Sequence, residues 1–249
     1  MKNISSKEAI DKLIFALDAK SYEEAMSWVE LLSNHVGMFK VGKELFTAVG
    51  PRIIQSIKER SQKVFLDLKF HDIPNTVARA AEAAVNLNID MFNVHASGGS
   101  QMMKDAVSAA RSFSDKMGRA RPVLLAVTVL TSLNNDDLKE IGFKKSTDEL
   151  VLRLAKLAKT AGASGVVASA RDISMLREKL GNDFVIVTPG IRSLTETNKD
   201  DQKRTLSAYE AIKAGADYIV VGRPIRTAKE PLAACRQIVQ EIEEGLTSR

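Results

Sequence analysis

Short apolar runs alternate along the chain with longer stretches in which apolar residues recur every three or four positions. The short runs are rich in β-branched and aromatic residues, which is typical of buried strands, whereas the longer spacing predicts amphipathic helices. The expected strands cover residues 13–17, 38–41, 63–66, 89–94, 122–130, 165–168, 184–187 and 217–221. The expected helices cover residues 21–34, 44–49, 52–60, 77–87, 147–160, 172–180 and 231–245, with a further apolar stripe over 102–110 and a short first helix that Ser5 or Ser6 can cap.

Strand and helix patterns alternate from one end of the chain to the other, and no Asn-Gly hairpin signal interrupts them. This order is typical of parallel βα units, and an open doubly wound sheet would share it. Eight expected strands and a length of 249 residues favour closure, because a (β/α)8 barrel typically needs about 250 residues. No Pro-, Gly- or Ser-rich linker divides the chain. We therefore predict an α/β protein with one domain over residues 1–249, a single (β/α)8 TIM barrel.

The stretch from Asp67 to Thr76, Asp-Leu-Lys-Phe-His-Asp-Ile-Pro-Asn-Thr, follows the third apolar run and is dense in charge. Strand side chains alternate between faces, so Asp67 and Lys69 are expected on one face, with Asp72 in the loop that follows. Two unit charges ~4 Å apart interact by roughly 4 kcal/mol at an effective dielectric of about 20, and desolvation makes crowding them costly. A buried salt bridge is the alternative for Asp67 and Lys69 alone, but the addition of Asp72 favours a functional site.

Two helix starts can be read from local sequence around this stretch and near the end of the chain. Pro74 is expected to end regular structure, after which Asn75 or Thr76 can cap a helix that begins at Val77. Ser207 can cap a helix before the last strand in the same way.

Charged residues gather where the expected strands end, at Asp18, Lys40, Asp67, Lys69 and Arg223. In (β/α)8 barrels the loops at the carboxyl ends of the strands carry function. After the eighth strand, Gly222 and Arg223 can bring backbone N–H groups and a guanidinium to a phosphate, although a simple turn explains them equally well. The long polar segment 189–204 after the seventh strand suggests a lid, with a solvated loop as the alternative.

His71 and His95 invite a metal-binding or general-base interpretation, but structural roles explain them better. The chain has no HxH, HExxH or CxxC spacing, so no metal site is predicted. It also lacks the Gly-x-Ser-x-Gly elbow of the serine hydrolases.

Charge and composition narrow the possible partners and the cellular location. The net charge of +5 comes from scattered Lys and Arg, and only 5% of residues are aromatic, so nucleic-acid binding is not expected. A binding site for one small anionic substrate, with basic residues at its entrance, is sufficient to explain the positive net charge. No stretch resembles a signal peptide or approaches membrane-spanning length, and the single cysteine, Cys235, excludes an internal disulfide. We expect a cytoplasmic protein without a membrane partner.

With these residues in view, the chain resembles the orotidine 5′-phosphate decarboxylase family over nearly its whole length. The full 67–76 decapeptide is the most specific part of the resemblance, and the shorter motifs follow one another in the order that the family has. These motifs are Phe15-Ala16-Leu17-Asp18, Phe39-Lys40-Val41-Gly42, Val94-His95-Ala96, Val129-Leu130-Thr131-Ser132, Thr188-Pro189-Gly190-Ile191-Arg192, Asp201-Gln202-Lys203-Arg204 and Val221-Gly222-Arg223-Pro224.

The resemblance implies a cofactor-free lyase that converts orotidine 5′-monophosphate to UMP and CO2 in pyrimidine biosynthesis. It implies that Lys69 gives a proton to C6, that Asp67 lies near the departing carboxylate, and that Lys40 and Asp72 complete an alternating charge array. It further implies a homodimer in which Asp72 and Thr76 reach the neighbouring subunit's site. The substrate-binding residues that it implies are Asp18 and Lys40 for the ribose hydroxyls, Thr131 beside the pyrimidine, Gln202, Gly222 and Arg223 for the phosphate, and Arg192 at an unspecified substrate oxygen.

The chain departs from the family pattern at two places in the expected lid. Asp200 stands where a small residue is usual, and Ser207-Ala208 replaces the usual Thr-Pro at the start of the next helix. These departures affect the expected conformation of the lid without ligand, and not the expected reaction.

Two other functions are compatible with parts of the sequence. A related magnesium-dependent sugar-phosphate decarboxylase or aldolase shares the Asp-x-Lys-x-x-Asp spacing, and Glu44 and Asp67 would then be possible carboxylate ligands. A non-catalytic nucleotide-binding barrel would bind UMP without releasing CO2.

Overall fold

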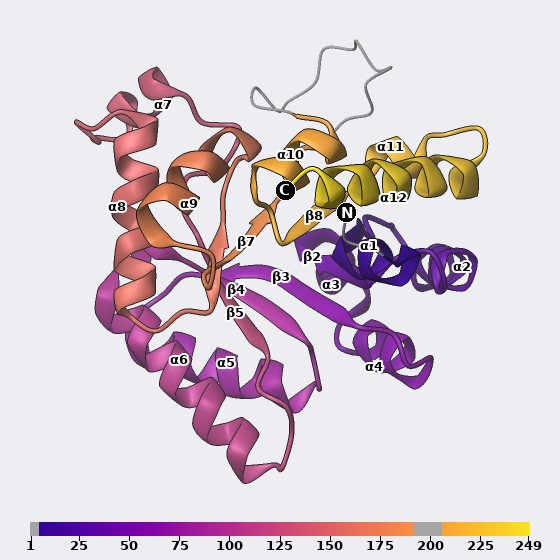
Figure 1. Cartoon of the computed structure of the whole chain (residues 1–249). Coiled ribbons are helices and arrows are strands. Elements are labelled where there is room, and N and C mark those ends of the chain that lie inside the picture. The colour runs from indigo at the N-terminus through magenta and orange to yellow at the C-terminus, as the bar shows by residue number, and fades with distance from the viewer. Residues whose placement is uncertain (1–4, 192–205) are drawn as a thin grey trace.

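The computed structural model describes residues 5–191 and 206–249, and in this part of the chain eight parallel strands close into a barrel surrounded by helices (Figure 1). Each strand pairs with the next, and the last strand pairs with the first through Leu13–Ile219, Ile14–Val220 and Phe15–Val221. The strands are β1 Leu13–Ala16, β2 Met38–Gly42, β3 Val64–Phe70, β4 Met91–His95, β5 Val123–Val127, β6 Gly165–Val167, β7 Val185–Thr188 and β8 Tyr218–Val221. The prediction of a (β/α)8 barrel is confirmed, and the open doubly wound sheet is excluded.

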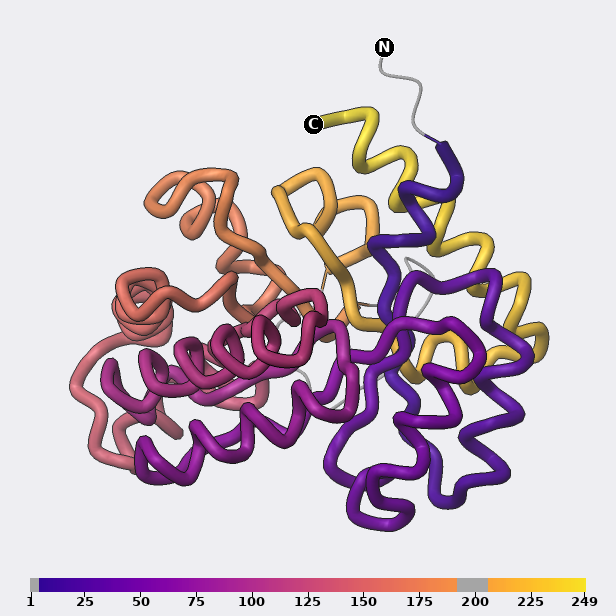
Figure 2. The backbone as a smooth tube through the Cα atoms, turned by 90° about the horizontal axis from the view of Figure 1, so that it is seen from below, coloured from indigo at the N-terminus to yellow at the C-terminus, as the bar shows by residue number. Residues whose placement is uncertain are grey.

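Helices cover the outside of the barrel, and the first and last of them pack side by side (Figure 2). The α-helices are α1 Ser6–Lys12, α2 Tyr22–Leu32, α3 Lys43–Val49, α4 Arg52–Glu59, α5 Pro74–Asn86, α6 Gly99–Lys116, α7 Asn135–Glu140, α8 Thr147–Thr160, α9 Ile173–Leu180, α10 Ala208–Ala214, α11 Arg223–Arg226 and α12 Pro231–Thr247. Short 3-10 turns, η1 Ala96–Gly98 and η2 Ala170–Asp172, precede α6 and α9. Within the described residues, none of these helices is long and apolar enough to cross a membrane.

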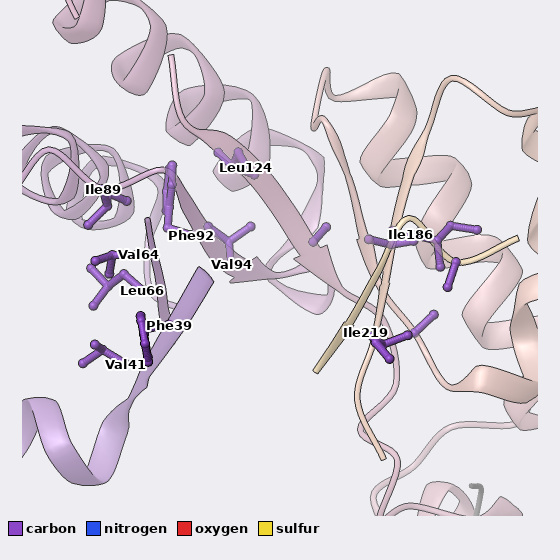
Figure 3. Packing of buried hydrophobic residues seen from close by; sticks show 14 of the residues in the cluster. Phe39, Val41, Val64, Leu66, Ile89, Phe92, Val94, Leu124, Ile186 and Ile219 are labelled. Carbon is purple, nitrogen blue, oxygen red and sulfur yellow. The ribbon is translucent and has the colours of Figure 1, made fainter. Parts of the chain in front are cut away.

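Alternation along the strands separates two apolar layers. Outward-facing residues such as Val64 and Leu66 of β3 and Phe92 and Val94 of β4 belong to the large cluster between barrel and helices (Figure 3). The intervening positions form a smaller cluster inside the barrel: Ile14, Ala16, Met38, Phe65, Met91, Leu125, Val187 and Val220. Burial of both faces explains why the strands read as continuous apolar runs in the sequence.

The inward-facing positions change character along each of the strands β2, β3 and β4. They begin with Met38, Phe65 and Met91, and two residues later they carry polar groups, Lys40, Asp67 and Asn93. The apolar residues fill the amino-terminal end of the barrel, so the polar side chains gather at its carboxyl-terminal end.

Local capping signals account for several helix starts. Ser5 caps α1 and Ser21 caps α2, and Ser207 forms a capping box with Glu210 at α10, as predicted. Helix α7 was not among the predicted helices. Its capping box between Asn134 and Asp137 is a local signal that could have revealed it.

The helix after the decapeptide begins earlier than predicted. Helix α5 starts at Pro74, with Ile73 at the cap position and no side-chain cap, so the predicted start at Val77 and the capping roles of Asn75 and Thr76 are wrong. Proline suits the first helical position, because its fixed φ matches the helix and its missing N–H would have no intrahelical partner there. Pro74 therefore begins the helix that it was expected to precede.

Candidate active site

A cavity of about 430 Å³ opens at the carboxyl-terminal ends of the strands. Its floor includes the inner-core residues Ala16, Phe65 and Val220, and its wall carries charged side chains. The predicted site residues that line it are Asp18, Lys40, Asp67, Lys69, Thr131, Gly222 and Arg223. The barrel thus brings together residues that are more than 200 positions apart in the sequence.

Four charged side chains alternate in sign along one side of this cavity. The Lys40 Nζ lies 3.7 Å from Asp18 Oδ1 and 3.2 Å from Asp67 Oδ2, and the Lys69 Nζ lies 2.6 Å from Asp67 Oδ1. Strand register explains part of this arrangement, since Ala16 pairs with Lys40 and Gly42 pairs with Asp67 across neighbouring strands. Each carboxylate therefore faces an ammonium, and Asp67 lies between two of them.

Asp67 is 9% exposed, and its environment keeps it ionised. Burial alone would raise the pKa of its carboxyl group, but the charges of Lys40 and Lys69, together with hydrogen bonds from Lys69 and Asn93, lower that pKa below the ordinary value. The pair of Asp67 and Lys69 is therefore an ion pair at neutral pH.

The backbone of β3 departs from a regular strand at the charged residues. Leu66 pairs with Phe92 and Phe70 pairs with Val94, so three residues of β3 stand opposite one residue of β4. Lys69 adopts φ +53°, in the left-handed region that non-glycine residues rarely occupy. Plain alternation along the strand predicted that Asp67 and Lys69 would lie together. In the structure the two side chains do meet, but in a segment where the register between β3 and β4 is irregular.

Asn93, the residue opposite this bulge, was not among the predicted site residues. Its side chain donates to Asp67 Oδ1 at 2.7 Å and accepts from the Lys69 backbone N–H at 2.8 Å. It is 1% exposed. An asparagine at an inward-facing position of an otherwise apolar strand was the signal that could have identified it.

The turn between β8 and α11 adjoins the Asp18 end of this charge array. A Cβ added to Gly222 would lie 3.1 Å from the Ala16 Cβ and 3.6 Å from Asp18 Oδ2, so glycine permits β8 and β1 to approach closely here. Arg226 donates to the Asp18 backbone carbonyl and thereby ties this turn to the end of β1. Arg223 lies exposed at the cavity rim.

Of the remaining predicted site residues, two are described and lie apart from this cavity. Asp72 is exposed, and its carboxylate accepts a hydrogen bond from the Ile73 N–H at 2.6 Å. Thr76 is exposed in the first turn of α5. Among the described lining residues, none comes from the stretch between Phe70 and Ala126. The other two, Arg192 and Gln202, lie outside the described residues, as does most of the expected lid.

His71 and His95 lie together beside the site, with ring centroids 5.4 Å apart. Burial, together with the nearby His71 and Lys69, lowers the pKa of His95 to about 4, so it is neutral at physiological pH. Among residues 5–191 and 206–249, no group of three or more His, Cys, Asp or Glu side chains is placed to hold a metal ion.

Sequence and structure comparisons agree on one family. The model of the orotidine 5′-phosphate decarboxylase / HUMPS family matches residues 11–238. The chain is 56% identical over 249 residues to the orotidine 5′-phosphate decarboxylase of Syntrophus aciditrophicus, covering 100% of this chain and 99% of that protein. It is 50% identical over 243 residues to that of Citrifermentans bemidjiense, covering 97% and 100%.

A solved structure with the same name adds the fold. The crystal structure of orotidine 5′-phosphate decarboxylase from Lactobacillus acidophilus superposes with a TM-score of 0.80 at 40% identity, covering 92% of this chain and 98% of that one. The chain therefore belongs to the orotidine 5′-phosphate decarboxylase / HUMPS family.

Proposed function

We propose that this protein is a carboxy-lyase that converts orotidine 5′-monophosphate to UMP and CO2, as the names of its relatives indicate, and so serves pyrimidine biosynthesis. The observation that carries the proposal is the alternating array Asp18–Lys40–Asp67–Lys69 at the mouth of the barrel. Fixed charges of this kind suit a reaction in which a bare anion must be stabilised without covalent help.

The chemistry of the substrate explains the need for an ammonium group. Breaking the bond between C6 and the carboxylate leaves an electron pair in the plane of the pyrimidine ring, where it does not overlap with the ring π system. The charge must therefore be stabilised from outside, and Lys69 can do so and then give its proton to C6. Its ion pair with Asp67 fixes the ammonium in place before substrate arrives.

The remaining residues of the cavity suit the rest of a nucleotide. We assign Asp18 and Lys40 to the ribose hydroxyls, Thr131 to the pyrimidine, and Gly222 and Arg223 to the phosphate. Arg192 and Gln202 belong to the same proposal on the strength of the sequence resemblance alone. Binding energy from the phosphate, which lies far from C6, can support the unfavourable approach of the substrate carboxylate to Asp67.

Asp72 and Thr76 enter the proposal through a second copy of the chain. Both are exposed and lie apart from the cavity of their own subunit. A homodimer that inserts them beside the partner's Lys69 would add a fourth link of alternating charge.

The family description also covers a second branch, so the metal-dependent alternative needs a direct test. That alternative uses Glu44 and Asp67 as metal ligands. Glu44 is exposed in the first turn of α3, whereas Asp67 is already held by Lys40, Lys69 and Asn93. We therefore expect CO2 release from orotidine 5′-monophosphate to persist after the protein is treated with EDTA. Loss of activity that magnesium restores would favour the metal-dependent branch.

The role of Lys69 is tested by Lys69→Ala. We expect turnover of orotidine 5′-monophosphate, followed by its absorbance change, to fall by at least about 10³-fold, because both charge stabilisation and the proton donor are lost. UMP binding, measured by calorimetry, should change by less than about tenfold, since the phosphate and ribose contacts remain. Lys104→Ala, an exposed lysine of α6, is the matched control and should keep full turnover. Substantial turnover by Lys69→Ala would overturn the assignment.

A further inference from the structure

We propose that Asn93 is a positioning residue for the decarboxylation: its carboxamide locks the Asp67 carboxylate and the Lys69 backbone into the one arrangement that aims the ammonium at the reacting carbon. The proposal rests on the proposed function, because it concerns the same reaction. It assigns a role to a residue that does not line the cavity and that the family motifs quoted above do not include.

The register between β3 and β4 creates the need for such a residue. Between the pairs Leu66–Phe92 and Phe70–Val94, the three residues 67–69 of β3 face Asn93 alone. In a regular parallel ladder every second residue of a strand bonds to the backbone of a given neighbouring strand. The bulge interrupts this pattern over residues 67–69, where the β4 backbone no longer supplies the regular partners. The Asn93 side chain takes the place of one of these partners by accepting the Lys69 N–H at 2.8 Å.

That hydrogen bond holds an unusual backbone conformation. Lys69 has φ +53°, in the left-handed region that residues other than glycine rarely adopt. The conformation places the Lys69 Nζ 2.6 Å from Asp67 Oδ1 on the cavity wall. Without the acceptor on Asn93, the backbone could relax toward an extended conformation and carry the ammonium away.

The other end of the same side chain fixes the carboxylate. The Asn93 Nδ2 donates to Asp67 Oδ1 at 2.7 Å, the oxygen that also accepts from Lys69 Nζ. A backbone N–H can only donate and an ionised carboxylate can only accept, so these two partners leave a single possible orientation for the amide. One rigid planar group therefore sets the distance between Asp67 and the backbone of Lys69.

Burial makes this link firm. Asn93 is 1% exposed, and both of its amide atoms are engaged by the charged pair, so water does not compete for either bond. Active-site groups act best when neighbouring residues lock their conformations, and Asn93 satisfies this condition for both Asp67 and Lys69.

The sharpest test is Asn93→Asp, which keeps the size and the acceptor for the Lys69 N–H but presents a second carboxylate to Asp67. At pH 8 the two carboxylates repel, and we expect kcat to fall by at least about 10²-fold while KM changes by less than about fivefold. Two adjacent carboxylates share a proton more readily than either holds one alone. As the pH falls toward 5, the shared proton restores a donor to Asp67, so kcat of the variant should rise, whereas kcat of the wild type should not.

The matched control is Thr188→Val, in a buried position of β7. Thr188 is fully buried and donates to the Ala168 carbonyl at 2.8 Å, so its loss removes a buried hydrogen bond of the barrel away from the bulge. It should lower the melting temperature without producing a kcat that rises toward acid. A merely structural role for Asn93 predicts the same behaviour for Asn93→Asp, and that result would overturn the proposal.

Two further readouts keep the outcomes distinct. The wild-type protein is assayed first for CO2 release from orotidine 5′-monophosphate, and an inactive wild type would refute the proposed function itself. If Asn93→Asp does not give folded protein by circular dichroism, Asn93→Thr decides, because its hydroxyl can still pair with one of the two partners. We then expect a kcat at least about tenfold below that of Thr188→Val. An equal kcat would count against positioning.

Discussion

Asp67 illustrates how neighbours decide the charge of a buried group. Its pKa in the folded protein is lower than in the unfolded chain, because two ammonium groups and an amide outweigh the effect of burial. Because the pKa is lower in the folded protein, the ionised carboxylate stabilises the fold at pH values above the ordinary carboxyl pKa, near 4. This stabilisation is lost as the pH falls through the pKa of the folded state. The charge array is therefore intact at neutral pH and fails only in acid.

His95 makes the unfolding free energy depend on pH between about 4 and 6.5. Its pKa of about 4 in the folded protein lies below the ordinary 6.5, so the unfolded chain binds a proton that the folded chain does not. This term stabilises the fold fully above pH 6.5 and is lost as the pH falls from 6.5 to about 4. At pH 5 the loss is at most about 2 kcal/mol, and partial exposure of the ring reduces it to roughly 1 kcal/mol.

We therefore expect the wild type to lose about 1 kcal/mol more unfolding free energy than His95→Gln between pH 7 and pH 5. Urea unfolding at the two pH values measures the difference. Equal losses of unfolding free energy in the two proteins would show that His95 does not cause this pH dependence.

Among the structural elements, the strands β6 and β7 approach so closely at Gly165 that a side chain there would clash. Gly165 of β6 pairs with Val185 of β7, and a Cβ at Gly165 would lie 2.1 Å from the Val185 carbonyl oxygen. Because that atom belongs to the backbone of a paired strand, it cannot move aside as a flexible side chain would.

Gly165→Ala is expected to lower the unfolding free energy by about 2–3 kcal/mol, because the strands must separate to admit the methyl group. Gly118→Ala is the control: its Cβ would meet nothing within 4 Å, and only its φ of +59° opposes the change, at a cost of about 1 kcal/mol. Urea midpoints of the two variants give the comparison. A smaller loss for Gly165→Ala than for the control would contradict the packing argument.

At the scale of the whole molecule, the role of Asp72 distinguishes an active site built by one chain from an active site shared by the two chains of a dimer. Each single chain forms a cavity with Lys69 on its wall and Asp72 outside it. If Asp72 acts in the partner's site, two variants that are each inactive can complement one another.

We expect Lys69→Ala and Asp72→Ala to regain activity when they are unfolded and refolded together. Random pairing makes half of the dimers mixed, and one of the two sites in each mixed dimer is native, so about a quarter of all sites should be active. Lys69→Ala mixed with Asp67→Ala is the control, since both residues belong to one chain's own site and no native site can form. Failure of the first mixture to exceed this control would refute the shared site.

The sequence by itself determined the barrel and most of its parts. Alternating apolar runs and helical stripes depend only on nearby residues, and so do the caps at Ser5, Ser21 and Ser207, whose partners lie three residues away. The polar ends of the strands also showed where a site would form, because parallel strands all point the same way. The prediction failed for the start of α5 at Pro74, where two local rules for proline compete.

Only the tertiary structure decided how the site is built. The bulge at Lys69 and its bond to Asn93 depend on the register between β3 and β4, which barrel closure sets for two residues 24 positions apart in the sequence. The distances within the charge array likewise come from strands that are distant in the chain. Local sequence identifies these side chains, but it does not determine the register between neighbouring strands. That register decides which charged groups lie side by side.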